Sequence, residues 1–102
     1  DEDVVRAERW ARENLHRAIS ASALAAAAGL SARTFARRVQ RATGMSPVHF
    51  LQRIRVERAV ELLETTDCTV EQIARRVGYA EPTTLRRLLR RNAGVRPRDL
   101  RA

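Results

Sequence analysis

The chain has 102 residues and carries 20 basic against 12 acidic side chains, which gives a formal net charge of +8. Every one of the 20 is arginine, the residue that pairs bidentately with phosphates and with guanine edges. The longest uncharged run, 18–32, is too short and too often interrupted for a transmembrane helix. Cys68 is the only cysteine, so an internal disulfide is excluded, and we expect a cytoplasmic domain.

In chain order, apolar residues at helical spacing and residues typical of helix ends predict three helices in the first half of the chain, over 3–17, 21–28 and 32–43. Ser20 and Ser31 are N-cap residues for the second and third helices. Gly29 and Gly44 follow these helices, where a glycine ends a helix in the left-handed conformation. The first half therefore predicts a helix followed by two short helices joined by a tight turn.

The middle of the chain predicts a long connecting helix over 47–66, opened by Ser46-Pro47. Its apolar face contains Leu51, Ile54, Leu62 and Leu63. Twenty residues of helix span roughly 30 Å, close to the spacing of about 34 Å between successive major-groove faces on one side of B-DNA. The window 57–71 holds five acids and only one arginine, so we expect this segment to face away from nucleic acid.

The last third predicts a second pair of short helices. Thr69 and Gln72 fit a capping box at the start of the first, which Gly78 ends. Pro82 is the first residue of a helix over 82–92, and Pro97–Ala102 can form one terminal turn. With the preceding segments, these residues predict an all-α fold of seven helices without strands.

One pattern occurs twice in the chain, about fifty residues apart. Its markers are Leu24-Ala25, Gly29, Phe35, Val39, Gly44 and Pro47 in the first copy, and Ile73-Ala74, Gly78, Leu85, Leu89, Gly94 and Pro97 in the second. The offset is 49 residues at Gly29 and Gly78 and 50 at Phe35 and Leu85, so the second turn holds one extra residue. Each copy reads as a helix-turn-helix unit.

The second helix of each copy is apolar on one side and cationic on the other. The apolar sides contain Phe35, Val39 and Ala42 in the first copy and Leu85 and Leu89 in the second. The opposite sides contain Arg33, Arg37 and Gln40, and then Thr83, Arg87 and Arg90 flanked by Arg86 and Arg91. Residues 32–43 hold four arginines and 83–98 hold six, with no acid in either window. This placement predicts DNA recognition by both helices.

The position of each polar side chain along these two helices predicts whether it contacts a base edge or a phosphate. Arg33 and Arg37 lie one turn apart at the beginning of 32–43, where side chains of a recognition helix approach base edges. Further side chains are better placed for phosphates, which set affinity and register, namely Arg41, Arg91, Ser31, Thr34 and Thr84. His16 and His49 show no metal-ligand spacing, and no motif of a catalytic site is present, so we expect no metal, no cofactor and no enzymatic activity.

The chain resembles the C-terminal DNA-binding domain of the AraC/XylS family of bacterial transcription regulators. The segments that carry the resemblance are Leu24-Ala25 with Gly29-Leu30-Ser31, Thr43-Gly44-Met45-Ser46-Pro47, Arg55 through Leu63, Ile73-Ala74 with Val77-Gly78-Tyr79, and Gly94-Val95-Arg96-Pro97. Residues 31–38 and 84–87 are most similar to the branch whose N-terminal half resembles a glutamine-amidotransferase-like fold. The chain begins at Asp1 without an initiating Met, so we expect an excised domain of a longer protein.

The resemblance implies one AraC-type domain over 1–102, with the N-terminal helix and first helix-turn-helix in 1–46, the linker helix in 47–66, and the second helix-turn-helix with the terminal turn in 67–102. It implies recognition helices 32–43 and 82–92 in two adjacent major grooves. The positions that read bases in the family correspond to Arg33, Ala36, Arg37, Thr83, Arg86 and Arg87. Those at the backbone or flanking it are Ser31, Thr34, Gln40, Arg41, Thr84, Arg90 and Arg91.

The partner implied is double-stranded DNA with two half-sites about one helical turn apart, bound by a monomer of this domain, while the full-length protein can be dimeric through its other part. Contact with RNA polymerase is a further implication of the family. Two alternatives stay open from the residues alone. One is a basic nucleic-acid-binding domain that reads only the backbone, and the other is a helical module that binds an acidic protein.

Overall fold

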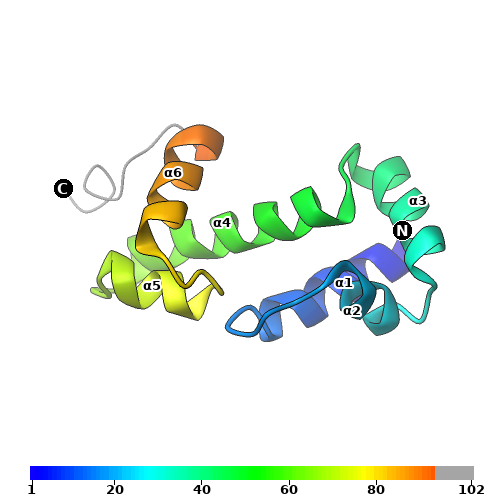
Figure 1. Ribbon diagram of the computed structural model, residues 1–102, viewed down its shortest axis with the longest axis horizontal. Helices are drawn as coiled ribbons and strands as arrows, with labels where there is room; N and C mark the ends of the chain where they lie inside the picture. The colour runs from blue at the N-terminus through cyan, green and yellow to red at the C-terminus, as the bar shows by residue number, and fades with distance from the viewer. Residues whose placement is uncertain (94–102) are drawn as a thin grey trace. The chain divides into compact units, whose positions relative to one another are not determined.

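The computed structural model describes the backbone of residues 1–93 and the side chains of residues 1–91, which form six α-helices and no strand (Figure 1). The helices are α1 (Glu2–Glu13), α2 (Ala21–Ala27), α3 (Ala32–Thr43), α4 (Pro47–Thr65), α5 (Val70–Arg76) and α6 (Pro82–Ala93). The all-α prediction is confirmed, with six helices rather than seven. The seventh predicted element, Pro97–Ala102, lies outside the described residues, as do the repeat markers Gly94 and Pro97.

Short polar side chains determine where the helices begin. Ser20 and Ser31 each accept a hydrogen bond from the backbone amide three residues later, at 3.0 and 3.2 Å. At α5 the capping box is complete, because the Thr69 hydroxyl accepts from the Gln72 amide at 3.1 Å and the Gln72 side chain accepts from the Thr69 amide at 2.8 Å. The predicted start of each of these helices is therefore set by local chemistry.

The end of α1 differs from the prediction. The helix stops at Glu13 rather than running to Arg17. Asn14 ends it, because its side-chain amide donates to the carbonyl of Trp10 at 2.8 Å and its backbone amide donates to that of Ala11 at 3.0 Å. Leu15 follows in irregular backbone and is still buried, so its apolar character reflects the core rather than a continued helix.

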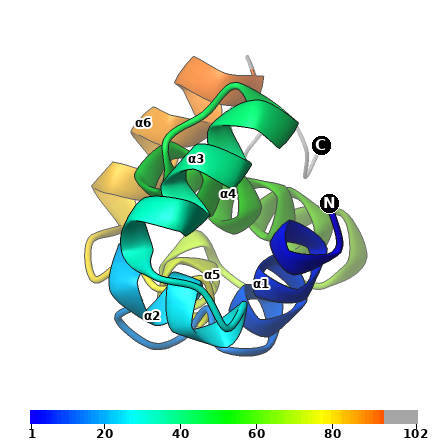
Figure 2. The same ribbon diagram turned by 90° about the vertical axis from the view of Figure 1, so that its right-hand side faces the viewer.

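The chain divides into two compact units, and the first spans Asp1–Ile54. In it α2 contacts both α1 and α3, and α1 also contacts α3 (Figure 2). Phe35 and Val39 of α3 are fully buried beside Leu24. Trp10 packs against this core as a partly buried side chain. These contacts fix the side of α3 that faces inward and leave its other side to solvent.

The second unit spans Arg55–Ala102, and within its described part α5 contacts α6. Its core comprises Val56, Ala59, Leu62, Leu63, Ile73, Ala74, Val77, Leu85, Leu88 and Leu89. Leu88 is buried although the sequence pattern did not single it out, whereas Ala42 of the first unit, expected on the apolar side, is exposed. Ala42 lies in the last turn of α3.

Helix α4 contributes to the cores of both units. Phe50, Leu51 and Ile54 belong to the first core, and the later residues Val56, Ala59, Leu62 and Leu63 belong to the second. The four residues predicted on one apolar face are all buried, but they divide between these two cores. Because α4 packs against two different cores, the side of the helix that is buried changes along its length. One apolar stripe along the whole helix therefore does not describe its burial.

Candidate nucleic-acid interface

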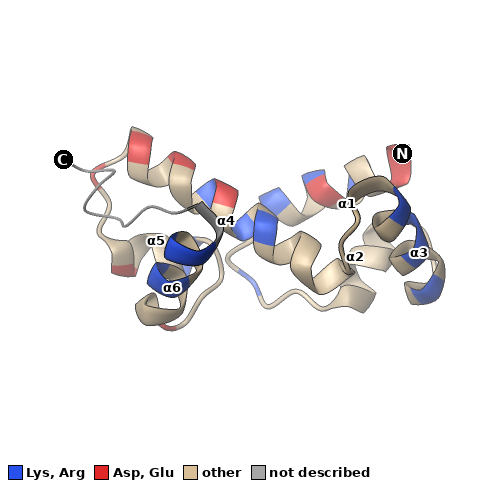
Figure 3. Ribbon diagram, turned by 90° about the horizontal axis from the view of Figure 1, so that it is seen from above, with Lys and Arg blue, Asp and Glu red and all other residues tan. Residues whose placement is uncertain are grey.

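The outer side of α3 is cationic and open to solvent. Arg33, Arg37, Gln40 and Arg41 are all exposed, whereas Phe35 and Val39 on the inner side are fully buried. Ala36 lies between these sides and is partly buried. Figure 3 shows the arginines along α3 and no acidic residue on that helix. The first unit thus brings together Arg33, Ala36 and Arg37, three of the six residues assigned to base contact, on one helix whose inner side packs in the core.

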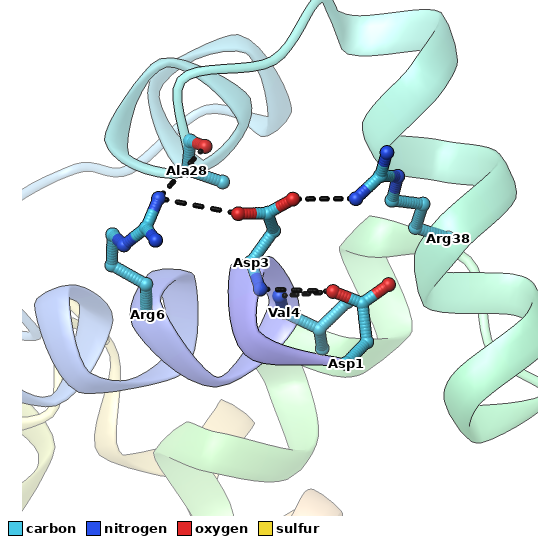
Figure 4. A network of polar contacts seen from close by, with 6 residues as sticks. All are labelled: Asp1, Asp3, Val4, Arg6, Ala28 and Arg38. Carbon is cyan, nitrogen blue, oxygen red and sulfur yellow. Dashed lines mark hydrogen bonds and ion pairs between the residues drawn. The ribbon is translucent and has the colours of Figure 1, made fainter.

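The fourth arginine of α3 has a different role. Arg38 is partly buried and bonds through Nη1 to Oδ2 of Asp3 in α1. Asp3 also pairs with Arg6 at 3.2 Å, and Arg6 donates to the carbonyl of Ala28 at the end of α2, at 3.4 Å (Figure 4). The Asp1 side chain caps α1 by accepting from the amides of Asp3 and Val4, at 2.8 and 3.3 Å. This network joins α1, α2 and α3.

The N-terminus of α3 also presents hydroxyl groups. The Ser31 hydroxyl is exposed and caps the helix, and it lies 3.0 Å from the hydroxyl of Thr34. Hydroxyls and backbone amides at a helix N-terminus are common partners of DNA phosphates. Ser31 and Thr34 therefore lie at the N-terminus of α3, next to the exposed Arg33 of the same helix.

The second unit repeats the arrangement on α6. Thr83, Arg86, Arg87, Arg90 and Arg91 are exposed and Thr84 is partly buried. The inner side is made by Leu85, Leu88 and Leu89. The helix contains no acidic residue, although Glu81 directly precedes it. In the rest of the described part of this unit, acidic residues lie on α4, in α5 and in the segment between these two helices (Figure 3). Each unit thus presents one basic helix face, supported by its own core.

One cation of α6 has an acidic partner that was not predicted from the sequence. Arg86 Nη2 lies 3.1 Å from Oε1 of Glu71, which is in the first turn of α5. The pKa of Glu71 is lowered, first because its carboxylate accepts a hydrogen bond from its own backbone amide and then because it accepts one from Arg86. Glu71 and Arg86 are fifteen positions apart and lie on two different helices. Helical periodicity therefore does not predict that they pair, and the only indication in the sequence is their opposite charge.

A buried arginine fixes the turn of the second unit. Arg55 of α4 is 7% exposed, and its Nη1 donates to the carbonyl of Val77 at the end of α5. Its guanidinium lies 5.8 Å from the centre of the Tyr79 ring. Burial lowers the pKa of Arg55 and raises that of Tyr79. Arg55 therefore joins α4 to the end of α5 by a hydrogen bond to a backbone carbonyl, as Arg6 joins α1 to the end of α2 in the first unit.

Two other features are absent from the residues that the structure describes. No group of three or more histidine, cysteine or acidic side chains is arranged to hold a metal ion. No helix among them is long and apolar enough to cross a membrane.

Comparison with known proteins assigns the family. A helix-turn-helix domain family model matches residues 24–102, which include α3 and α6. The chain belongs to the AraC/XylS-type family of DNA-binding domains. The HTH-type transcriptional activator RhaS of Escherichia fergusonii is 35% identical over 92 residues, and that of Salmonella schwarzengrund is 34% identical over the same length. Each match covers 90% of this chain and 33% of RhaS, so this AraC-type domain spans about a third of these relatives.

Solved structures of AraC-type domains resemble this one. The DNA-binding domain of AdpA, a global transcriptional factor crystallised with a target DNA, is 40% identical with a TM-score of 0.84, over 96% of this chain and 88% of that one. An AraC-type regulator from Chromobacterium violaceum has a TM-score of 0.91 at 23% identity, over 98% and 89% of the two chains, which speaks for the fold alone.

Proposed function

We propose that this chain binds double-stranded DNA sequence-specifically, as the DNA-binding domain of a bacterial transcription regulator. The observation that carries the proposal is the exposed arginine face on α3 and again on α6, each opposite a buried apolar side. Arginine reads guanine through O6 and N7. The similarity of 40% to the AdpA domain, which was crystallised with its target DNA, supports the same conclusion.

The residues divide into base readers and backbone contacts. Arg33 and Arg37 are the principal base readers, because they are exposed at the beginning of α3 and form no ion pair among the side chains that the structure describes. Ala36 offers a methyl group suited to a thymine methyl, and Thr83, Arg86 and Arg87 read bases from α6. The backbone contacts are Ser31, Thr34, Gln40, Arg41, Thr84, Arg90 and Arg91.

The two helices read two half-sites about one helical turn apart on the DNA, in a single copy of the domain. Helix α4 has 19 residues, which corresponds to about 28 Å of helix, and it contributes to the cores of both units. One continuous helix between two recognition units favours binding by a monomer, without a dimer interface in this domain.

Selection of duplexes from a randomised DNA pool, with the domain at near-physiological salt, tests the proposal. Enrichment of two G-containing blocks about one turn apart is the expected result. Enrichment of one block would restrict base reading to one of the two units. Measurable binding without any enrichment would contradict sequence-specific recognition and leave backbone binding alone, and binding of an acidic protein in preference to DNA would replace nucleic acid as the partner.

A further inference from the structure

The ion pair between Glu71 and Arg86 places an acid beside a cation of the recognition face. The two side chains are 3.1 Å apart, with 55% of the Glu71 side chain and 44% of the Arg86 side chain exposed. Exposed ion pairs contribute little to folding stability. We therefore relate the pair to DNA binding by Arg86 and not to the folding stability of the second unit.

The backbones that carry the pair are fixed. Glu71 lies between Val70 and Gln72 in the first turn of α5, inside the capping box that Thr69 and Gln72 complete. Arg86 follows the fully buried Leu85. Since both Cα atoms are held in place, the ion pair restricts the remaining freedom, which is the direction of the Arg86 side chain.

The first unit has no counterpart to this pair. The repeat offsets match Glu71 to Ser22 and Arg86 to Ala36, which are both uncharged. Among the arginines assigned to base reading, Arg33, Arg37 and Arg87 form no ion pair with the described part of the chain. Arg86 is thus the base-reading arginine that the described residues hold by a carboxylate, and it stands where the first unit has no cation.

From these contacts we infer that Glu71 is a specificity-determining residue, which positions Arg86 toward a base edge. By holding the guanidinium in this position, Glu71 also reduces sequence-independent binding of Arg86 to DNA phosphates. The inference rests on the proposed function. A guanidinium presents a planar fork of donors, so a carboxylate that engages one nitrogen leaves the others aimed in one direction. The carboxylate also lowers the local positive charge and repels DNA phosphates, which weakens sequence-independent attraction. Glu71 carries its negative charge at neutral pH, as an ordinary glutamate does, and the hydrogen bonds to its carboxylate lower its pKa further.

The variant Glu71→Gln tests this, because it removes the charge while keeping the size of the side chain. Its affinity is measured for the selected duplex and for a shuffled duplex of equal length. We expect the affinity for the shuffled duplex to rise several-fold and the ratio of specific to non-specific affinity to fall about tenfold, which is the order of one lost directed base contact. The loss of preference is confined to the base pairs read by α6. Melting curves of the variant and the parent establish that both fold.

A matched control is available on α4. Arg58 and Glu61 form an ion pair at 2.9 Å with exposed fractions of 44% and 50%, in the same unit but within one helix. Glu61→Gln removes the same charge from α4 instead of α5, so we expect both duplexes to bind slightly more tightly and the affinity ratio to be unchanged. In the Arg86→Ala background, Glu71→Gln leaves the ratio unchanged, because the residue that it positions is gone.

The possible results distinguish the role of Glu71 from sequence-specific binding by the domain as a whole. If the parent domain prefers its selected duplex and Glu71→Gln behaves like Glu61→Gln, the role of Glu71 is overturned while sequence-specific binding stands. If the parent shows no preference between the two duplexes, the proposed function fails and the role of Glu71 fails with it. A drop in the ratio that appears only in Glu71→Gln, and vanishes without Arg86, establishes the positioning role.

Discussion

Arginine side chains in this chain fall into two groups according to what they contact. Arg6 and Arg55 each donate to a backbone carbonyl just before the turn of a helix-turn-helix unit, and Arg38 pairs with Asp3. Arg33 and Arg37 are exposed on α3. A high net positive charge thus includes both structural cations and cations open to a ligand, and substitutions in the two groups should affect different measurements.

Arg37→Ala should reduce affinity for the selected duplex by roughly 1–3 kcal/mol and relax preference at one or two base pairs, because a bidentate contact to a guanine edge is lost. Arg91→Ala, in the last turn of α6, should weaken binding to all duplexes alike and reduce the salt slope by about one. Binding isotherms on the selected and shuffled duplexes at several salt concentrations measure both effects. Equal losses on every duplex in both variants would remove Arg37 from the base readers.

Phe35→Ala should destabilise the first unit by about 3–5 kcal/mol, because the fully buried ring of α3 leaves a cavity when it is removed. Urea unfolding followed by circular dichroism measures the change. Val48→Ala is the control, since Val48 is 67% exposed and its truncation should cost little. An unchanged unfolding midpoint in Phe35→Ala would contradict the core placement of α3.

Individual exposed arginines could be predicted from the sequence, whereas their partners could not. The side of α3 that carries Arg33 and Arg37 follows from the buried Phe35 and Val39 on a helix of regular period. The bond from Arg38 to Asp3 joins residues 35 positions apart, and it depends on how α1 packs against α3. Local periodicity holds no information on such packing.

At the scale of elements, helix starts were predictable because the responsible groups are local. Ser20, Ser31 and the Thr69 capping box act within three residues of themselves. The end of α1 was predicted wrongly because Asn14 closes it with two hydrogen bonds, while the apolar pattern continues to the buried Leu15. An apolar residue that is buried just after a helix continues the apolar pattern of that helix, so the sequence pattern predicts a longer helix than the structure has.

The end of α3 depends on Gly44, which has φ +75° and whose amide donates to the carbonyl of Gln40 at 2.8 Å. Gly44→Ala should cost about 1–2 kcal/mol, because a side chain disfavours the left-handed conformation, although a Cβ there would meet no atom within 4 Å. Gly44→Asn should cost less, since asparagine tolerates this conformation. Equal melting temperatures for the parent and the alanine variant would show that the conformation is not required.

The turn of the second unit depends on Arg55. Arg55→Met should destabilise that unit by roughly 1–3 kcal/mol, because the carbonyl of Val77 loses its donor in a buried place. Arg58→Met, three residues later on an exposed side of α4, should change stability by no more than about 0.5 kcal/mol. Denaturant titrations of the two variants compare them, and a similar small effect in both would exclude a structural role for the buried guanidinium.

At the scale of the whole molecule, the prediction is that affinity depends on the spacing between the two half-sites on the DNA. If one copy of the domain reads two half-sites about one turn apart, inserting about 5 base pairs between them turns the second half-site to the opposite side of the duplex. Affinity should then fall to that of a duplex with one half-site. Gel-shift titration of the parent, inserted and single-site duplexes measures this, and equal affinity of the parent and inserted duplexes would contradict bipartite reading.

The contribution of α4 to both cores has a consequence for exchanging parts between relatives. Ile54 and Arg55 are neighbours in one helix, yet the first belongs to one unit and the second to the other. A chimera joined at this point keeps each half of α4 with the core that it packs against, whereas a join at either end of α4 would combine half of the helix with a core from the other parent. Whole units exchanged between Ile54 and Arg55 therefore retain their own cores, as do exchanges limited to the exposed residues of α3 or α6.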